Sequence, residues 1–443
     1  MFENSEDPNS KNKIIIISAI TLVILGIIVT VFLMLSKKVT VGAGNITLTY
    51  WGFDEKKPIQ TIADNFKGKS KNVKVEYTQK GSTPEEYQKI LDEAIASGEG
   101  PDLFQIRNDW LPMNYKKMAT MPKDVYTVDE YKKLFYPVAF QDLSKGEDIY
   151  AIPFYIDTLV LYANKTILES KALNSIAGGW NEFNKYSKFL RKTTNGIEIA
   201  GTSLGTADNI SYSPDLLYML MLQNQATMTS PDNKTAYFNL SLKDRYNNIT
   251  YPSANALGYY TSFATPGNDN YTWNNSMPAA LNAFIDGKTA LYFGYASDRK
   301  IIESATNKSL QYMIFNAPQQ TGNISYFAKY WATGVSKNSK NQSDAWSFIK
   351  YVTKDEIMPT YGSLTNLPLA RKDLNANLQF AGNYMDVFIS QLPKATSWNK
   401  GNWEETDKAF KESINNVLLG KETPQQAMDS CATKVTKILE EVN

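Results

Sequence analysis

The sequence contains no histidine and only one cysteine, and each absence narrows what the protein can do. Without histidine there is no Ser-His-Asp or Cys-His catalytic arrangement, and the commonest metal ligand in proteins is missing as well. Hydrolases built on those chemistries are therefore excluded. Cys431 cannot form an internal disulfide, and its place on the apolar side of a predicted helix indicates a core thiol. We expect no catalytic residue, no metal site and no cofactor.

The sequence also has almost no excess charge of either sign. It carries 46 Lys and Arg against 45 Asp and Glu, a net charge of +1. A protein that grips a polyanion needs a positive field, so nucleic acid is not an expected partner. With 43% apolar and 21% charged residues the chain is typical of globular proteins. Its 443 residues are too many for one ordinary core and suit two α/β lobes plus a further segment.

One long apolar run lies near the N-terminus, at residues 14–35, and reads IIIISAITLVILGIIVTVFLML. As a helix it would be about 33 Å long, enough to cross a bilayer core. We expect a transmembrane anchor there, a short cytoplasmic tail at 1–13 and a tether at 36–45. The alternative is a secretory signal cut near Val41–Gly44, although such signals have shorter apolar regions. Because long domains translocate largely regardless of local charge, we predict a single-pass protein of the cell membrane with its large domain extracellular.

Strand and helix patterns alternate after the tether. Alternating or continuous β-type residues predict strands at Ile46–Trp51, Val73–Tyr77 and Leu103–Ile106. Apolar residues at helical spacing predict one helix before the second strand and another after Thr83, where Thr83 and Glu86 suit a capping box. The βαβαβ order predicts a mostly parallel sheet with helices covering its faces.

Ligands of such sheets bind beyond the carboxyl ends of the strands, so the residues that follow each strand are candidates. Trp51 and Asp54 follow the first strand, and Asn108 and Asp109 follow the third. A tryptophan beside a carboxylate suits a binding site. The alternative is an aromatic residue packed on the surface next to a solvated acid.

The segment Ala151–Lys165 combines a strand-edge proline with a buried strand. Tyr155 and Asp157 lie between them, and we interpret the segment as the first crossing between two lobes, with the ligand bound between the lobes. We expect further crossings near Tyr295 and near Trp331, which follow or lie in strand-like segments. The expected N-terminal lobe comprises 46–155 and 296–328, and the expected C-terminal lobe comprises 156–295 and 329–443.

Seven segments taken together resemble a known family. They are YWGFDE from Tyr50, GEGPDLFQI from Gly98, IYAIPFYIDTLVLYANKTIL from Ile149, WNEFNKYSKFL from Trp180, AFIDGKTALYFGYAS from Ala283, WATGVSKNSKNQSDAWSFIKYVT from Trp331 and LPLARKDL from Leu367. In order and spacing the chain from Asn45 onward is similar to the extracellular solute-binding proteins of ABC importers, family 1, the sugar-type group that includes maltose-binding proteins. The Asn- and Tyr-rich stretch 227–275 matches no motif of that family.

The resemblance implies the type II periplasmic-binding-protein-like fold, with two α/β lobes, three hinge crossings and a cleft that closes on a saccharide. It implies a protein that works as a monomer and delivers its ligand to an ABC permease. The positions that match the family's ligand-binding residues are Trp51, Asp54, Glu55, Asn108, Asp109, Tyr155, Asp157, Tyr295, Trp331 and Trp403. Arg371 matches a position that either contacts ligand or pairs with a structural carboxylate.

Carboxylates and amides suit sugar hydroxyls, and aromatic rings suit the apolar faces of sugars. Three other functions stay open. A cleft of carboxylates and tryptophans also suits a polyamine, a peptide or a metal chelate. A glycoside hydrolase with Asp109 and Asp157 as its two carboxylates needs no histidine. A purely adhesive surface protein would bind no small molecule between its lobes.

Overall fold

The computed structural model describes residues 45–68, 72–243, 246–376 and 384–442. Thr47–Asn443 form one compact unit, and the helices and strands below belong to it except for Ile46 at the start of β1. The predicted tail and anchor, at 1–13 and 14–35, and all of the tether except Asn45, lie outside the described residues. Within the described ranges, no helix combines the length and the apolar character needed to cross a bilayer.

The first of two five-stranded sheets has the order β2-β1-β3-β15-β6. Its strands are β1 (Ile46–Gly52), β2 (Val73–Gln79), β3 (Leu103–Arg107), β6 (Ala151–Pro153) and β15 (Trp331–Val335). β1 and β3 are parallel, whereas β15 runs antiparallel to both β3 and β6, so the sheet is mixed. The register of β15 places Trp331 opposite Arg107, at the edge where β1 and β3 end.

The second five-stranded sheet has the order β13-β7-β12-β9-β8. Its strands are β7 (Val160–Asn164), β8 (Lys192–Thr193), β9 (Ile197–Thr202), β12 (Thr289–Gly294) and β13 (Tyr312–Asn316). β7 is antiparallel to both of its neighbours, and Gly294 pairs with Val160. We call the part of the chain around the first sheet the first lobe and the part around the second sheet the second lobe.

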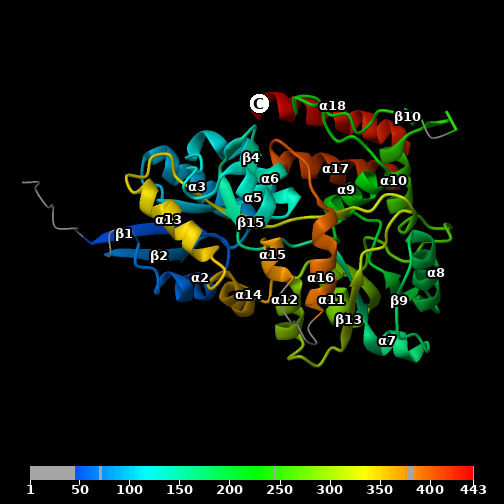
Figure 1. The fold of residues 1–443 in the computed structure, drawn as a ribbon. Coiled ribbons are helices and arrows are strands. Elements are labelled where there is room, and N and C mark those ends of the chain that lie inside the picture. Colours follow the sequence, from blue (N-terminus) through cyan, green and yellow to red (C-terminus); the bar gives the residue numbers. More distant parts are fainter. Residues whose placement is uncertain (1–44, 69–71, 244–245, 377–383, 443) are drawn as a thin grey trace, which may run out of the picture. The chain divides into compact units, whose positions relative to one another are not determined.

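The helices divide between the two lobes (Figure 1). Those of the first lobe are α2 (Lys56–Ala63), α3 (Pro84–Ser97), α4 (Leu111–Asn114), α5 (Val128–Leu134), α6 (Pro137–Leu143), α13 (Gln342–Val352), α14 (Met358–Thr365) and α15 (Lys372–Asn375). Those of the second lobe are α7 (Lys165–Ser170), α8 (Trp180–Leu190), α9 (Ser213–Gln223), α10 (Pro252–Ser262), α11 (Ala280–Ile285), α12 (Asp298–Ala305), α16 (Met385–Gln391), α17 (Trp403–Leu418) and α18 (Pro424–Val442). Some helices pack directly on a sheet, such as α2 on β2 and α8 on β9, and others pack on neighbouring helices, such as α17 on α18. There are also short strand pairs β4–β5 (Ser144–Lys145, Asp148–Ile149), β10–β11 (Leu242–Lys243, Ile249–Thr250) and β14–β16 (Tyr326–Phe327, Ala395–Thr396), and short 3-10 helices η1 (Asn108–Trp110), η2 (Tyr115–Lys117) and η3 (Leu392–Lys394).

The strand pairing corrects part of the expected lobe division. The crossing predicted at Ala151–Lys165 is present, because β6 belongs to the first sheet and β7 to the second. No crossing follows Tyr295, since β13 pairs with β7 and keeps residues 296–316 in the second lobe. The chain returns to the first lobe between β13 and β15, so the segment from Trp331 to Asn375 belongs to the first lobe. Antiparallel pairing across β7 and β3 decides both assignments, and hydrophobic pattern alone does not reveal a pairing partner.

Two helix starts show how local sequence fixes local structure. The Thr83 hydroxyl accepts a hydrogen bond from the Glu86 amide, but Glu86 itself accepts from Ser82, so the predicted reciprocal capping box is only half formed there. At α18 the reciprocal box is complete between Thr423 and Gln426. Cys431 is buried on the apolar face of α18, as predicted.

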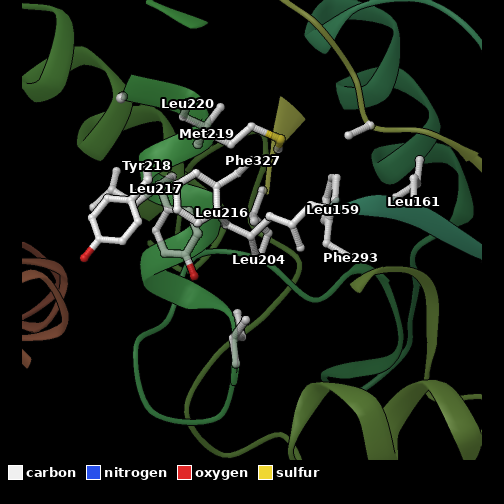
Figure 2. Close-up of a cluster of buried hydrophobic side chains, with 14 of the residues drawn as sticks. Leu159, Leu161, Leu204, Leu216, Leu217, Tyr218, Met219, Leu220, Phe293 and Phe327 are labelled. Atoms are coloured by element: carbon white, nitrogen blue, oxygen red, sulfur yellow. The ribbon is translucent and has the colours of Figure 1, made fainter. Parts of the chain in front are cut away.

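The second lobe is built around α9, whose residues are buried on nearly every side. Figure 2 shows Leu216, Leu217 and Leu220 of this helix in a cluster with two other residues. These are Leu159, which directly precedes β7, and Phe293 of β12. A helix that is apolar all round must lie inside the domain. At the N-terminal end of α9, Asp215 Oδ2 accepts from the Tyr295 hydroxyl at 3.1 Å and the Tyr212 hydroxyl donates to Asp298 at 2.7 Å, so this end lies next to the loop that follows β12.

Candidate functional site

A cavity of about 930 Å³ lies between the two lobes, at the edges where β3 and β12 end and β15 begins. We call it the cleft. Its walls include Phe53, Asp54, Glu55, Gln79, Arg107 and Trp331 of the first lobe, Tyr212, Asp215, Tyr295, Ser297, Trp403 and Asp407 of the second, and Tyr155, Asp157 and Lys329 of the crossing segments. Seven of the ten predicted site residues are therefore brought together in one cavity.

Asp54 and Tyr155 meet where the first-strand loop approaches the crossing segment. The Tyr155 hydroxyl donates to Asp54 Oδ1 at 3.2 Å, and Gln105 Nε2 donates to Asp54 Oδ2 at 2.6 Å. Burial raises the pKa of Asp54 to about 6, and these two hydrogen bonds oppose the rise. Glu55 lies farther out and forms an ion pair with Lys300 of α12. Asp54 thus presents a carboxyl group to the cleft from a fixed position.

Asp157 is buried, and backbone amides surround it. Oδ1 accepts from the Thr158 amide and the Ala296 amide, each at 2.9 Å, and Oδ2 accepts from the Ser297 amide at 3.1 Å. It therefore fastens the crossing segment to the loop between β12 and α12. Burial raises the pKa of Asp157 to about 7, against the effect of these amides. Asp157 shapes the cleft mainly by holding backbone in place.

The raised pKa of Asp157 gives a pH prediction. A carboxyl whose pKa rises from its ordinary value of 3.8 to about 7 on folding stabilises the fold below pH 4, and the stabilisation is lost as the pH rises to 7. The unfolding free energy of the wild type should therefore fall relative to that of Asp157→Asn as the pH rises from 4 to 7, because the asparagine side chain does not ionise. The expected change is about 1.4 kcal/mol for each pH unit between the two pKa values. Urea unfolding at each pH measures it, and parallel stability curves for the two proteins would contradict it.

Asn108 and Asp109 lie outside the cleft lining, in the turn after β3. Asp109 is buried and accepts from Arg107 Nε at 2.6 Å and Nη2 at 2.7 Å, while Lys400 Nζ lies 3.0 Å from Oδ2. Asn108 donates to Asp142 at 2.9 Å. Both residues border a separate cavity of about 590 Å³. Asp109 is turned toward Arg107 for a local reason. A buried guanidinium requires a carboxylate partner, and Asp109 is the nearest carboxylate along the chain.

Arg107 and Asp109 extend into a buried charge network that joins the two lobes. Lys400, which is 1% exposed, lies 3.0 Å from both Asp109 Oδ2 and Asp407 Oδ1. Lys329 pairs with Asp215 at 2.8 Å. Burial alone would raise the pKa of Asp109, but Arg107 and Lys400 outweigh it and hold that pKa well below its usual range.

Aromatic rings supply the apolar part of the cleft wall. Trp331 stacks on Phe53 with ring centroids 5.0 Å apart, and Tyr295 meets Tyr212 edge-on at 4.9 Å. Trp403 comes from the second lobe, yet its Nε1 donates to Gln88 of α3 at 2.7 Å. These rings stand on both sides of the cleft.

Trp51 lies outside the cleft lining, and Lys80 covers its ring at 4.4 Å. Successive side chains of a strand point to opposite faces, and Tyr50 and Gly52 take the buried face of β1. Phe53, just past the strand end, lines the cleft in place of Trp51. Arg371 is also settled as structural, because it bonds Asp355 and Asp373.

Sequence reasoning missed several residues that line or support the cleft, namely Phe53, Gln105, Tyr212, Asp215, Lys329 and Lys400. Phe53 lies inside the recognised YWGFDE segment and could have been found there. Tyr212, Asp215 and Lys400 lie in segments without a motif, and packing alone brings them to the cleft.

The geometry does not favour the two-carboxylate hydrolase. Asp109 lies outside the cleft lining, and its carboxylate is held by Arg107 and Lys400. Both oxygens of Asp157 accept from backbone amides, so the two carboxyl groups do not flank one ligand position in the cleft. In the part of the chain that the structure describes, no three His, Cys, Asp or Glu side chains are grouped to hold a metal ion.

Comparisons with known proteins point to one family. A family model described as bacterial extracellular solute-binding protein matches residues 61–384. The chain is 21% identical over 357 residues to a galactooligosaccharide-binding protein of Bacillus subtilis, covering 76% of each chain. It is 28% identical over 115 residues to a maltotriose-binding protein of Pyrococcus abyssi, a match that spans 26% of this chain and 24% of that relative.

Solved structures show the same fold. The cyclic alpha-maltosyl-1,6-maltose binding protein of Arthrobacter globiformis superposes with a TM-score of 0.73 at 14% identity, covering 90% of this chain and 100% of that one. An ABC transporter solute-binding protein of Thermotoga lettingae bound with alpha-D-tagatose gives a TM-score of 0.71 at 20% identity, covering 89% of this chain and 100% of that one. The predicted two-lobe α/β fold is thereby confirmed.

Proposed function

Because the chain belongs to the bacterial extracellular solute-binding proteins, we propose that it binds a mono- or oligosaccharide in the cleft between its lobes. Binding would proceed by hinge closure, since a ligand that touches both walls favours the closed state by its differential affinity. The protein would carry out no reaction of its own and would deliver the ligand to an ABC permease. Similar proteins whose names state a sugar ligand support the saccharide class.

The observation that carries this proposal is the combination of aromatic rings and polar groups on opposite cleft walls. Phe53 and Trp331 stand on the first lobe, and Tyr212 and Tyr295 stand on the second. A pyranose ring presents apolar faces to such rings and hydroxyl groups at its edge. Asp54, held at one end of the cleft, is placed to accept from those hydroxyls.

The charges of the cleft favour a neutral ligand over a polyamine or another ion. Arg107 is paired with Asp109, and Lys329 with Asp215. Lys400 faces Asp109 and Asp407, and the Asp157 carboxylate is occupied by backbone amides. These groups are already neutralised by opposite charges or held by backbone amides. Asp54, whose partners are neutral amide and hydroxyl groups, is placed to accept from a sugar hydroxyl.

We also propose that residues 14–35 anchor the protein in the cell membrane with its large domain outside the cell. The support is the uncharged apolar run of the sequence, whose length suits a bilayer. Membrane extraction of the full chain by detergent but not by alkaline carbonate, together with protease access to the large domain on intact cells, tests this arrangement.

Titration calorimetry with a panel of ligands tests the function. We expect saturable binding, in the micromolar range or tighter and so worth about 8 kcal/mol, to maltotriose or to a galactooligosaccharide. Spermidine, a tripeptide and a ferric chelate should give none. Solution scattering should show compaction with the same sugar. Binding of spermidine alone would overturn the saccharide class, and binding of no panel member would favour an adhesive role.

A further inference from the structure

Gln105 is 1% exposed and directs its whole side-chain amide at the loop that follows β1. Its Oε1 accepts from the Phe53 amide at 2.9 Å and from the Asp54 amide at 3.1 Å. Its Nε2 donates to the Asp54 carboxylate at 2.6 Å. One amide group on β3 thus fixes both the backbone of Phe53 and Asp54 and the orientation of the Asp54 side chain.

The chain leaves room for this contact at Gly52. A Cβ atom on Gly52 would lie 2.3 Å from Gln105 Oε1 and 2.4 Å from the Tyr77 hydroxyl. Real atoms do not approach so closely, so only glycine lets the Gln105 side chain pass beneath the loop. The position of the Gln105 side chain therefore requires a glycine at residue 52.

Phe53 and Asp54 are the two cleft residues that this arrangement holds. Phe53 stacks on Trp331 at 5.0 Å, and Asp54 accepts from Tyr155 of the crossing segment at 3.2 Å. Without the Gln105 contacts, the loop could rotate Phe53 off Trp331 and turn Asp54 away from Tyr155. Such a buried, fully bonded amide is how proteins fix a binding group before the ligand arrives.

We infer that Gln105 is a positioning residue for ligand binding, which presets Phe53 and Asp54 in the cleft without touching the ligand itself. The expected effect of Gln105 on ligand affinity rests on the proposed function. Its expected effect on the titration of Asp54 rests on the geometry alone.

The groups around Asp54 determine what a titration would report. Glu55 and its partner Lys300 lie on the outer side, and the hydroxyl groups of Tyr155 and Tyr361 bond the Asp54 carboxyl group. Tyr50 and Tyr77 interact with its charge from the strands, although the Tyr50 hydroxyl bonds Thr333 and the Tyr77 hydroxyl donates to the Asp54 backbone carbonyl. The hydrogen bond from Gln105 to the carboxylate, at 2.6 Å, is shorter than that from Tyr155, at 3.2 Å. Removing its donor should therefore move the titration of Asp54 upward from about 6.

The first arm of the test needs no ligand. Carboxyl ¹³C NMR of the full chain, with Asp54→Asn for assignment, follows the Asp54 titration in wild type and in Gln105→Met. We expect the midpoint to rise in Gln105→Met. Gln60→Met is the matched control, because Gln60 is another first-lobe glutamine whose side chain bonds backbone groups. Its Oε1 accepts a hydrogen bond from the Tyr77 amide at 3.0 Å, and its Nε2 donates to the Val75 carbonyl oxygen at 3.0 Å. It should lose stability like Gln105→Met and leave the midpoint unchanged.

The second arm measures affinity for maltotriose and for a galactooligosaccharide. Gln105→Met should bind about tenfold to a hundredfold more weakly, as expected for the loss of a charge-assisted hydrogen bond, while Gln60→Met should bind like wild type. An unchanged midpoint in Gln105→Met would overturn the inference. If neither sugar binds wild type, the proposed function fails while the first arm still decides the role of Gln105.

A swapped pair keeps the test decisive if Gln105→Met does not fold. In Gln105→Glu combined with Asp54→Asn, a carboxylate accepts the loop amides and the new side-chain amide donates to it, so the loop contacts are restored in reverse. The double variant should recover most of the stability that Gln105→Met loses, yet bind sugar weakly because the cleft carboxylate is gone. A swap no more stable than the single variant would show that these contacts do not hold the loop.

Discussion

Replacing Lys400 with methionine is expected to destabilise the folded protein by about 3–5 kcal/mol, the usual cost of removing one partner from a buried ion pair. Lys400 is 1% exposed, and its ammonium group faces Asp109 and Asp407 at 3.0 Å each. Methionine fills a similar volume but leaves these carboxylates buried without their cation. Burial alone would lower the pKa of Lys400, but Asp407, Asp109 and Asp215 outweigh it and raise that pKa, so the cation belongs to the folded state.

Urea unfolding at pH 7 measures this effect, with Lys437→Met at an exposed position of α18 as the control. The pKa values of Asp109 and Asp215 are lowered in the folded protein by Arg107, Lys329 and Lys400. The stability that these two ionised carboxylates contribute is therefore present above pH 4, and it is lost as the pH falls through their lowered pKa values. The destabilisation by Lys400→Met should shrink on acidification. A difference from Lys437→Met of less than 1 kcal/mol, on the order of a surface pair, would show that the network is unimportant.

Replacing Trp331 with leucine is expected to weaken saccharide binding by about 30-fold or more, the loss of roughly 2 kcal/mol typical of a central aromatic contact. Trp331 lines the cleft, stacks on Phe53 at 5.0 Å and meets Trp110 edge-on at 5.0 Å. Leucine keeps an apolar side chain in place but offers no broad face to a sugar ring. The expected loss is in the dissociation rate, because the entrance to the cleft is unchanged.

Trp346→Leu is the matched control for Trp331→Leu. Trp346 is 1% exposed on α13, away from the cleft lining, so the same substitution removes the same volume from the core of the same lobe. Both variants should lose stability, and only Trp331→Leu should lose affinity for maltotriose or a galactooligosaccharide in calorimetry. Equal affinities for the two variants would place the sugar elsewhere.

The sequence predicts those residues of the candidate site whose position depends on neighbouring residues in the chain, and it does not predict those whose position depends on distant partners. Asp54, Tyr155 and Tyr295 follow strands or lie in the first crossing, and their place beside the cleft follows from strand ends alone. Trp51 lies outside the cleft lining because its side chain points to the other face of β1, and Phe53 lines the cleft instead. Asp109 lies outside the cleft lining because Arg107, two residues earlier, and Lys400, far along the chain, both form ion pairs with its carboxylate.

The sequence by itself determined that this is an α/β protein of two lobes without histidine chemistry, because composition, strand pattern and helix caps act over a few residues. It also located the first crossing at Ala151–Lys165. Only the tertiary structure decided which lobe holds β13 and β15, since strand pairing joins segments whose sequences carry no mark of their partner. The same holds for Gln105 and Lys400, whose importance depends on groups that folding alone brings within hydrogen-bond distance.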